Sequence, residues 1–195
     1  MRPVAGPLRQ LPASPGRRGE IVVRRWRRED GQALNQAVIG SREHLRPWMP
    51  WAHEDPPTLA ARRKLFAEWE RDWRAGGDAF YGIFVAGAVA GGCGLHRRLG
   101  PEALEIGYWL AADFTGRGVM TAAGELLTDA AFSVPGIQFV EIHHDRANER
   151  SGGVPRRLGY TLVGEVAREP QAPAEIGVEC RWRMTRQQWL ARGSA

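Results

Sequence analysis

One stripe of apolar side chains predicts a long amphipathic helix in the middle of the chain. Its positions recur at i, i+3, i+4, i+7 and onward, the period of about 3.6 residues that places them on one helical face. They are Val119, Ala122, Ala123, Leu126, Leu127, Ala130 and Ala131. The pattern stops before Pro135 and Gly136, which favour a helix end.

Shorter runs with a period of two predict strands on both sides of this helix. The expected strands cover residues 20–26, 79–85, 89–96, 104–111, 137–145, 160–167 and 178–184. Asp30 and Thr58 can each cap a helix, and a short helical segment is expected near residues 151–158. Because a helical crossover leads to residues 137–145, this strand is expected to lie parallel to the one before it, whereas the others form an antiparallel meander and a closing pair. The fold class is therefore α/β, with a mixed, mostly antiparallel central sheet flanked by helices.

Residues 1–19 break this pattern. They contain several prolines and glycines without a hydrophobic period, so we expect a disordered basic arm, followed by a single domain over residues 20–195. The arm holds four arginines and no acidic residue, whereas the formal net charge of the whole chain is +5. The domain is therefore nearly neutral, and its charge does not indicate a nucleic-acid partner, although the arm keeps a ribosome-associated or nucleic-acid-associated role open.

Composition excludes several other classes of protein. Cys93 and Cys180 are the two cysteines, too few for a disulfide framework, so reduced thiols are expected. No stretch approaches the ~18 consecutive apolar residues of a membrane span, and no apolar leader is apparent. We expect a cytoplasmic protein with no membrane partner.

A glycine turn, residues 115–118, precedes the central helix. The first turn of a helix leaves backbone N–H groups unpaired and carries partial positive charge. Gly116 and Gly118 allow a bulky anion to approach these groups, and Arg117 adds a full charge. The turn therefore predicts a phosphate site, although a plain strand-to-helix connection has the same sequence signature. It is not the dinucleotide fingerprint, because Thr121 stands where that motif requires its third glycine.

The run from Glu105 to Thr121, followed by Asn148-Glu-Arg-Ser151 and Leu158-Gly-Tyr160, resembles the GNAT superfamily of acyl-CoA-dependent N-acyltransferases. More narrowly, it resembles the RimJ/RimL branch, which acetylates amino groups. The likeness spans about residues 20–190. It includes the loop with Trp48 and Trp51, which either packs on the sheet or forms a wall of the acceptor pocket, and the closing Trp189.

The resemblance implies acetyl-CoA as co-substrate, with its pyrophosphate on the glycine turn and no metal. The strand over residues 105–110 would splay from its neighbour and bind the pantetheine arm. The implied binding residues are Leu110, Ala112, Gly116, Arg117, Gly118, Val119, Met120, Thr121 and Asn148. Thr115 and Met120 depart from the family pattern, but backbone N–H groups would supply most of the binding.

The resemblance also implies that Ser151 protonates the departing thiolate. Alternatively, Asn148 or Ser151 simply caps the following helix. Gly152-Gly153-Val154-Pro155 is poor helix sequence, so that helix is expected to be short or kinked.

A charged amine also needs a base before it can attack. Glu105 is the first candidate and His143 the second, with Glu141 and His144 also considered. His144 shares a face with apolar residues and is expected to be a core histidine. A water chain without a dedicated base remains open.

The sequence thus predicts an N-acetyltransferase that moves an acetyl group from acetyl-CoA to a primary amine by direct attack in a ternary complex. The acceptor would be a protein N-terminus or a small-molecule amine, and a homodimer is left open. The main alternative is an acyl-CoA-binding module without catalysis.

Overall fold

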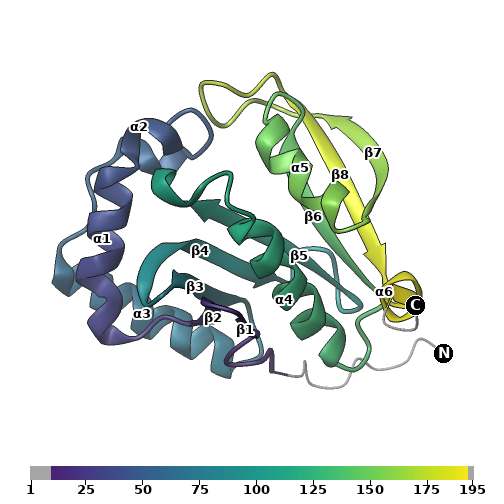
Figure 1. Ribbon diagram of the computed structural model, residues 1–195, viewed down its shortest axis with the longest axis horizontal. Coiled ribbons are helices and arrows are strands. Elements are labelled where there is room, and N and C mark those ends of the chain that lie inside the picture. Colours follow the sequence, from purple (N-terminus) through teal and green to yellow (C-terminus); the bar gives the residue numbers. More distant parts are fainter. Residues whose placement is uncertain (1–9, 193–195) are drawn as a thin grey trace.

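The computed structural model describes residues 10–192 (Figure 1). Its strands are β1 (Gly16–Arg18), β2 (Ile21–Arg25), β3 (Ala79–Val85), β4 (Ala88–His96), β5 (Ala103–Leu110), β6 (Phe139–Asp145), β7 (Thr161–Ala167) and β8 (Val178–Thr185). Its α-helices are α1 (Gly31–Gly40), α2 (Arg42–Leu45), α3 (Leu59–Arg74), α4 (Val119–Ser133), α5 (Glu149–Arg157) and α6 (Arg186–Arg192). Three 3-10 turns, η1 (Arg28–Asp30), η2 (Pro50–His53) and η3 (Ala112–Phe114), complete the described elements.

The strands form one eight-stranded sheet in the order β1-β2-β3-β4-β5-β6-β8-β7. Every neighbouring pair is antiparallel except β5 and β6. The β5–β6 pair is parallel because α4 carries the chain back along the sheet between them. The predicted fold class is confirmed, including the position of the single parallel pair.

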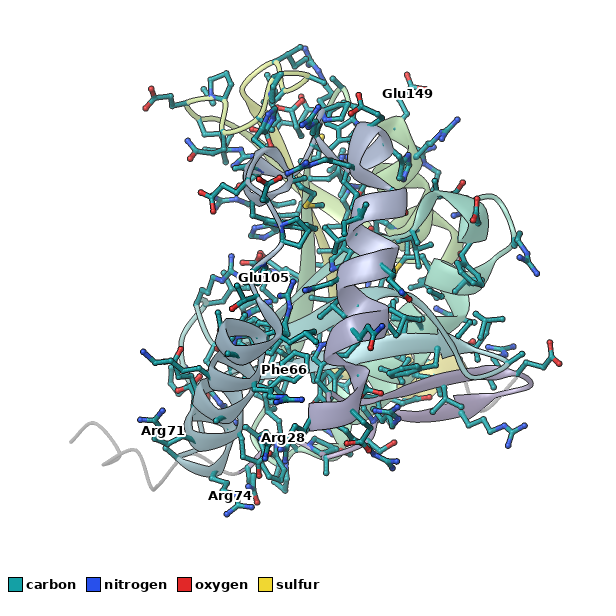
Figure 2. All side chains as sticks on the ribbon, turned by 90° about the vertical axis from the view of Figure 1, so that its left-hand side faces the viewer. Arg28, Phe66, Arg71, Arg74, Glu105 and Glu149 are labelled. Carbon is teal, nitrogen blue, oxygen red and sulfur yellow. The ribbon has the colours of Figure 1, made fainter. Side chains whose placement is uncertain are left out.

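Helices cover both faces of the sheet. On β3, Ile83 belongs to the core cluster that contains the buried stripe of α4, whereas the next residue, Phe84, belongs to a second cluster with α1 and α3. Alternate strand residues point to opposite faces, so α4 lies on one face and α1 with α3 on the other. Helix α3 is amphipathic in the same sense: Phe66 points toward the sheet, and Arg71 and Arg74 point outward (Figure 2).

The parallel pair separates halfway along its length. Its register runs from Ala103 opposite Phe139 to Ile106 opposite Ile142 and then ends. The last four residues of β5, from Gly107 to Leu110, therefore leave β6 while they stay paired with β4. This is the splay that the family resemblance implied.

The expectation of a disordered arm is wrong for residues 10–18. Leu11 is 1% exposed, and its carbonyl accepts a hydrogen bond from Trp73 Nε1. Tyr81 Oη donates to the Pro12 carbonyl, and β1 adds to the sheet edge, where Arg18 forms an ion pair with Glu125 of α4. The Trp73 indole and the Tyr81 phenol each need a hydrogen-bond acceptor where they pack, and residues 11 and 12 supply it. The proline-rich composition of this segment gives no sign of these contacts. Residues 1–9 lie outside the described residues.

Candidate active site

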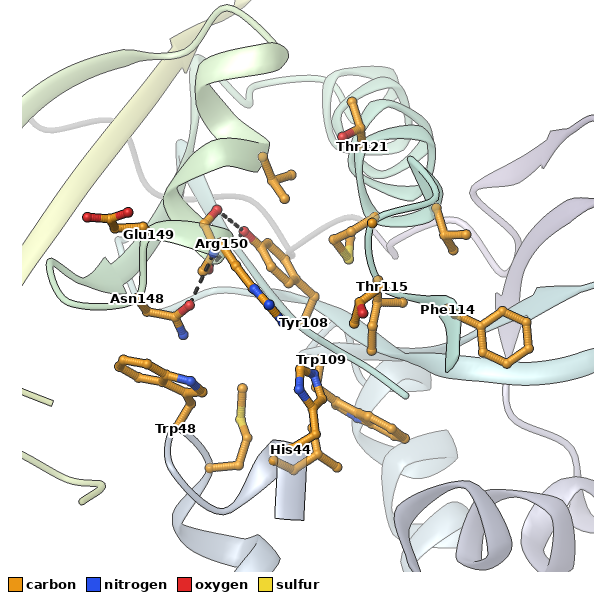
Figure 3. Close-up of a pocket in the computed structure, with 18 of the residues that line it drawn as sticks. His44, Trp48, Tyr108, Trp109, Phe114, Thr115, Thr121, Asn148, Glu149 and Arg150 are labelled. Carbon is orange, nitrogen blue, oxygen red and sulfur yellow. Dashed lines mark hydrogen bonds between the residues drawn. The ribbon is translucent and has the colours of Figure 1, made fainter. Parts of the chain in front are cut away.

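A pocket of about 830 Å³ opens where β5 leaves β6 (Figure 3). Four segments line it: α2 with the loop after it, the end of β5, the glycine turn with the start of α4, and α5 with the two residues before it. It includes most of the predicted site residues, namely Leu110, Gly116, Gly118, Val119, Met120, Thr121, Asn148 and Ser151. The segments that the sequence singled out separately thus meet around one cavity.

The glycine turn presents bare backbone to this pocket. Gly116 and Gly118 have φ values of 71° and 74°, in the left-handed region that favours glycine. A Cβ atom on either residue would meet no atom within 4 Å, so both face open space. Gly118 is the N-cap of α4 and has no side chain to offer. Within residues 10–192, no acceptor reaches the N–H groups of residues 116–121.

Positive charge reaches the pocket from α5 rather than from Arg117. Arg117 lies outside the pocket lining, over the Phe114 ring and near the Asp113 carbonyl. Arg150 and Arg157 line the pocket instead, and Arg157 Nε donates to Thr121 Oγ1 in the first turn of α4 at 3.0 Å. These arginines are distant in sequence from the turn, so no local motif signals them.

Ala112 also lies outside the pocket lining, and its role in cofactor binding stays a prediction. Its backbone N–H donates to Ser41 Oγ at 3.0 Å. The buried Ser41 hydroxyl thereby fixes the start of η3 and uses the donor that a ligand would need. Sequence alternation alone does not reveal this contact between residues 71 positions apart.

Asn148 and Ser151 lie together at the start of α5. Asn148 is the N-cap, and its Oδ1 accepts the Ser151 N–H at 3.1 Å. The capping role is therefore present, but it does not remove either residue from the pocket, because both residues line it, as Figure 3 shows for Asn148.

Pro155 lies inside α5 and determines a neighbouring hydrogen bond. A proline has no N–H, so the carbonyl four residues earlier, on Ser151, has no helical donor. Tyr108 Oη of β5 donates to that carbonyl at 3.0 Å and also lies 3.1 Å from Ser151 Oγ. The helix is short, as expected, and it continues through the proline, with Tyr108 supplying the missing donor.

Tyr108 and Ser151 form a hydroxyl pair within the pocket. Burial raises the pKa of Tyr108 to about 12, even though the hydrogen bond with Ser151 favours ionisation, so the phenol keeps its proton near neutral pH. A carbonyl can only accept. While the phenol donates to the Ser151 carbonyl, the serine hydroxyl is therefore the donor between the two oxygens. Sequence analysis missed Tyr108; the signal was the proline placed four residues after Ser151.

Gly152 fixes the distance between α5 and β6. A Cβ atom there would lie 2.6 Å from His144 Cε1, and two hydrogen bonds hold the His144 ring in place. Trp182 Nε1 donates to its Nε2 at 2.9 Å, so its Nδ1 carries the proton toward the Asp145 carbonyl at 2.7 Å. Burial is the largest cause of the lowered pKa of His144. His144 is therefore a partly buried histidine whose two ring nitrogens both have hydrogen-bond partners, on the face of the strand where its core role was predicted.

Gly152→Ala is therefore expected to destabilise the protein by about 1–3 kcal/mol through overpacking. Gly153→Ala is the matched control, because its Cβ would meet the movable guanidinium of Arg157 and alanine favours a helix. Urea unfolding of both variants measures the difference. Equal stability of the two would show that His144 yields readily.

Glu105 and His143 do not line the pocket. Ile106 and Ile142 belong to the core cluster with α4, so these polar neighbours point to the other face of the sheet. His143 Nε2 lies 2.6 Å from Glu141 Oε2, and its Nδ1 lies 3.7 Å from Glu105 Oε2. The structure brings the predicted bases together with each other but not with Ser151, and their role in proton transfer stays a prediction.

The tryptophan loop both packs on the sheet and lines the pocket, while its contact with an acceptor stays a prediction. Trp48 lines the pocket, whereas Trp51 packs edge-to-face on Trp109 with ring centroids 5.7 Å apart. Trp109 also lines the pocket, so the loop and β5 build one aromatic wall. Among residues 10–192, no cluster of three or more His, Cys, Asp or Glu side chains is suited to hold a metal, and no helix has the length and apolar character needed to cross a bilayer.

Comparisons with known proteins agree with this geometry. The model of the acetyltransferase (GNAT) domain family matches residues 20–161. The Bacillus subtilis (strain 168) protein named "Putative ribosomal N-acetyltransferase YdaF" is 29% identical over 147 residues, which cover 74% of this chain and 80% of that protein.

Solved structures share the fold at lower identity. RimL, a ribosomal L7/L12 alpha-N-protein acetyltransferase in complex with coenzyme A, has a TM-score of 0.78 at 20% identity and covers 92% of this chain and 99% of its own. The ribosomal-protein-S5-alanine acetyltransferase from Vibrio fischeri has a TM-score of 0.77 at 17% identity, with 90% and 98% coverage. The chain therefore belongs to the GNAT acetyltransferase family and is an acyl-CoA-dependent N-acyltransferase.

Proposed function

We propose that the protein acetylates the α-amino group of a protein N-terminus, by direct attack of the amine on acetyl-CoA in a ternary complex. One observation carries the proposal: a single pocket joins a bare helix N-terminus, a hydroxyl pair and an aromatic wall. These parts suit a diphosphate, a departing thiolate and an incoming chain end, respectively.

The residues present fit acetyl-CoA, which supplies an activated thioester when bound. The free N–H groups of the glycine turn and the Arg157 guanidinium would hold the pyrophosphate. Leu110 and the side-chain amide of Asn148 would contact the pantetheine arm, since both line the pocket between the turn and Ser151. Asn148 keeps its NH2 group for this purpose because its cap uses the oxygen.

In this proposal, Ser151 Oγ gives its proton to the departing sulfur. Tyr108 can then turn its own proton from the Ser151 carbonyl to Ser151 Oγ, because both oxygens lie within hydrogen-bond distance of the phenol. The two cysteines do not offer a covalent route. Cys93 and Cys180 are buried and lie outside the pocket lining, and burial raises the pKa of both thiols.

The names of the relatives support ribosomal proteins as the source of the acceptor amine. The Bacillus subtilis relative is named for the ribosome, and two proteins of the same fold act on the L7/L12 α-amine and on the S5 alanine. We therefore test peptides that begin with serine or alanine, each beside its Nα-acetylated copy, with spermidine as a small-molecule amine. Acetyl transfer to the free peptides alone supports the proposal; transfer to spermidine alone would contradict it. The oligomeric state stays a prediction.

Coenzyme A is expected to raise the thermal midpoint by several degrees. A ligand at about 100 times its dissociation constant stabilises the folded state by about 2.7 kcal/mol, and a domain of this size shifts by about 2–4 °C per kcal/mol. Differential scanning fluorimetry with CoA, acetyl-CoA and ADP measures the shift. A shift with CoA but no acetyl transfer to any amine would favour the binding module; no shift with CoA would contradict the phosphate site.

A further inference from the structure

The pocket contains an imidazole that no motif signalled. His44 of α2 is half-buried and lines the pocket, and Figure 3 shows its ring extending from α2 beside Trp109. Among the described lining residues, the other side chain that could accept a proton near neutral pH is Glu149. Glu149 is exposed, and its carboxylate points away from the interior of the pocket (Figures 2 and 3).

We propose that His44 is the general base that takes a proton from the attacking ammonium group. The inference rests on the proposed acetyl transfer and extends it to a catalytic residue outside the predicted set. It replaces Glu105 and His143, which lie outside the pocket, with a group that shares the cavity with Ser151.

The surroundings of His44 lower its pKa and so favour the neutral imidazole. Burial is the main cause of its lowered pKa, and the positive charge of Arg150, which lines the pocket from α5, lowers it further. Burial acts in the opposite direction on Tyr108 and raises its pKa to about 12. The pocket thus favours the neutral form of His44, which can accept a proton, and the protonated form of Tyr108, which can donate one. Acyl transfer to an amine requires both a base and an acid.

Other charged groups near His44 are already paired or turned away. On α2 and just after it, Arg42 pairs with Asp55, and Glu43 pairs with Arg46. From the glycine turn, Arg117 lies over Phe114. The end of β5 contributes Tyr108 as its one titratable lining residue. Arg150 is therefore the charge that we expect to tune His44.

The proton balance assigns distinct tasks to the two ends of the pocket. The ammonium gives its first proton to His44, which releases it to solvent. The freed lone pair forms the C–N bond, and the C–S bond breaks. Ser151 protonates the sulfur, and the second proton lost by the amine nitrogen restores the hydroxyl pair. The products are an amide, a thiol and one proton.

The test is the pH dependence of kcat/KM for the best peptide acceptor. About a tenth of α-amino groups with pKa ~8 are neutral at pH 7. His44→Gln should therefore lose about tenfold at pH 7, with a loss that grows as pH falls and disappears above about pH 8.5. Hydroxylamine, a weakly basic amine that is neutral at pH 7, should show little loss. His53→Gln, an exposed histidine of η2 outside the pocket lining, is the matched control and should behave like the wild type.

Two outcomes would overturn the inference. A loss in His44→Gln that is equal at every pH and for both amines indicates a structural role. The second outcome is a shift in the low-pH side of the kcat/KM profile in Glu105→Gln or His143→Gln, but not in His44→Gln. It would assign the base to the other face of the sheet.

An NMR titration of the His44 ring separates this inference from the proposed function, because it needs no turnover. The His44 resonance should titrate below the ordinary imidazole value of about 6.5, and Arg150→Gln should raise that midpoint, whereas His143→Gln should not. If no amine is acetylated but the His44 midpoint is low and rises in Arg150→Gln, the proposed acetyl transfer fails. The effect of Arg150 on the His44 pKa is then still supported. If the titration midpoint of His44 is the same in Arg150→Gln as in the wild type, the inference is overturned, even where acetyl transfer is found.

Discussion

Gly118→Asp is expected to raise the dissociation constant for CoA by about 10²–10³-fold. Gly118 is the N-cap of α4, faces open space in the pocket and has a φ of 74°. A carboxylate there would point at the position proposed for the pyrophosphate. Two like charges about 4 Å apart repel by about 4 kcal/mol at an effective dielectric constant of about 20, which corresponds to about 10³-fold in affinity. Isothermal titration calorimetry with CoA measures the change.

Gly118→Asn is the matched control for this prediction. Asparagine has nearly the shape of aspartate and tolerates the left-handed conformation about as well, but it carries no charge. It should weaken CoA binding by about tenfold at most, through lost space and modest backbone strain. Equal dissociation constants for the two variants would show that no phosphate lies near the helix start, and the proposed site would then have to be abandoned.

Ser151→Ala is expected to lower kcat by about 10²–10³-fold, the usual contribution of a positioned general acid. The Michaelis constant for acetyl-CoA should change little, because Asn148 and the backbone of α5 remain in place. Tyr108→Phe should cost about tenfold, since it removes the group that restores the Ser151 proton. Steady-state kinetics of the single and double variants measure these effects. The double variant should resemble Ser151→Ala, because the two hydroxyls act as one unit.

Tyr160→Phe is the control, because Tyr160 is a buried tyrosine outside the pocket. Its hydroxyl lies 2.7 Å from Thr128 Oγ1, a pair much like Tyr108 and Ser151, but Tyr160 does not line the pocket. Its loss should cost about 1 kcal/mol of stability and leave kcat unchanged. If Ser151→Ala retains wild-type turnover, or if Tyr160→Phe loses as much as Tyr108→Phe, the hydroxyl pair is not the acid.

The fold followed from local sequence because its signals are periodic. The stripe from Val119 to Ala131 predicted α4, and five of its seven residues are buried. The glycine turn correctly marked the start of α4, and the helical crossover correctly predicted that β5 and β6 are parallel. Residues 10–18 were predicted wrongly, because what holds them is contact with Trp73 and Tyr81 rather than any pattern of their own.

The amino-acid sequence by itself determined most of the elements, the glycine turn and the family resemblance, since each depends on residues that are close along the chain. The splayed strand was an implication of that resemblance. Tertiary structure alone decided what surrounds the pocket. It brought Arg157 to the start of α4, paired Tyr108 with the Ser151 carbonyl that Pro155 leaves without a donor, and placed His44 rather than Glu105 in the cavity. The physical reason is that burial, hydrogen bonding and charge act through space, between segments whose separation along the chain carries no periodic signal.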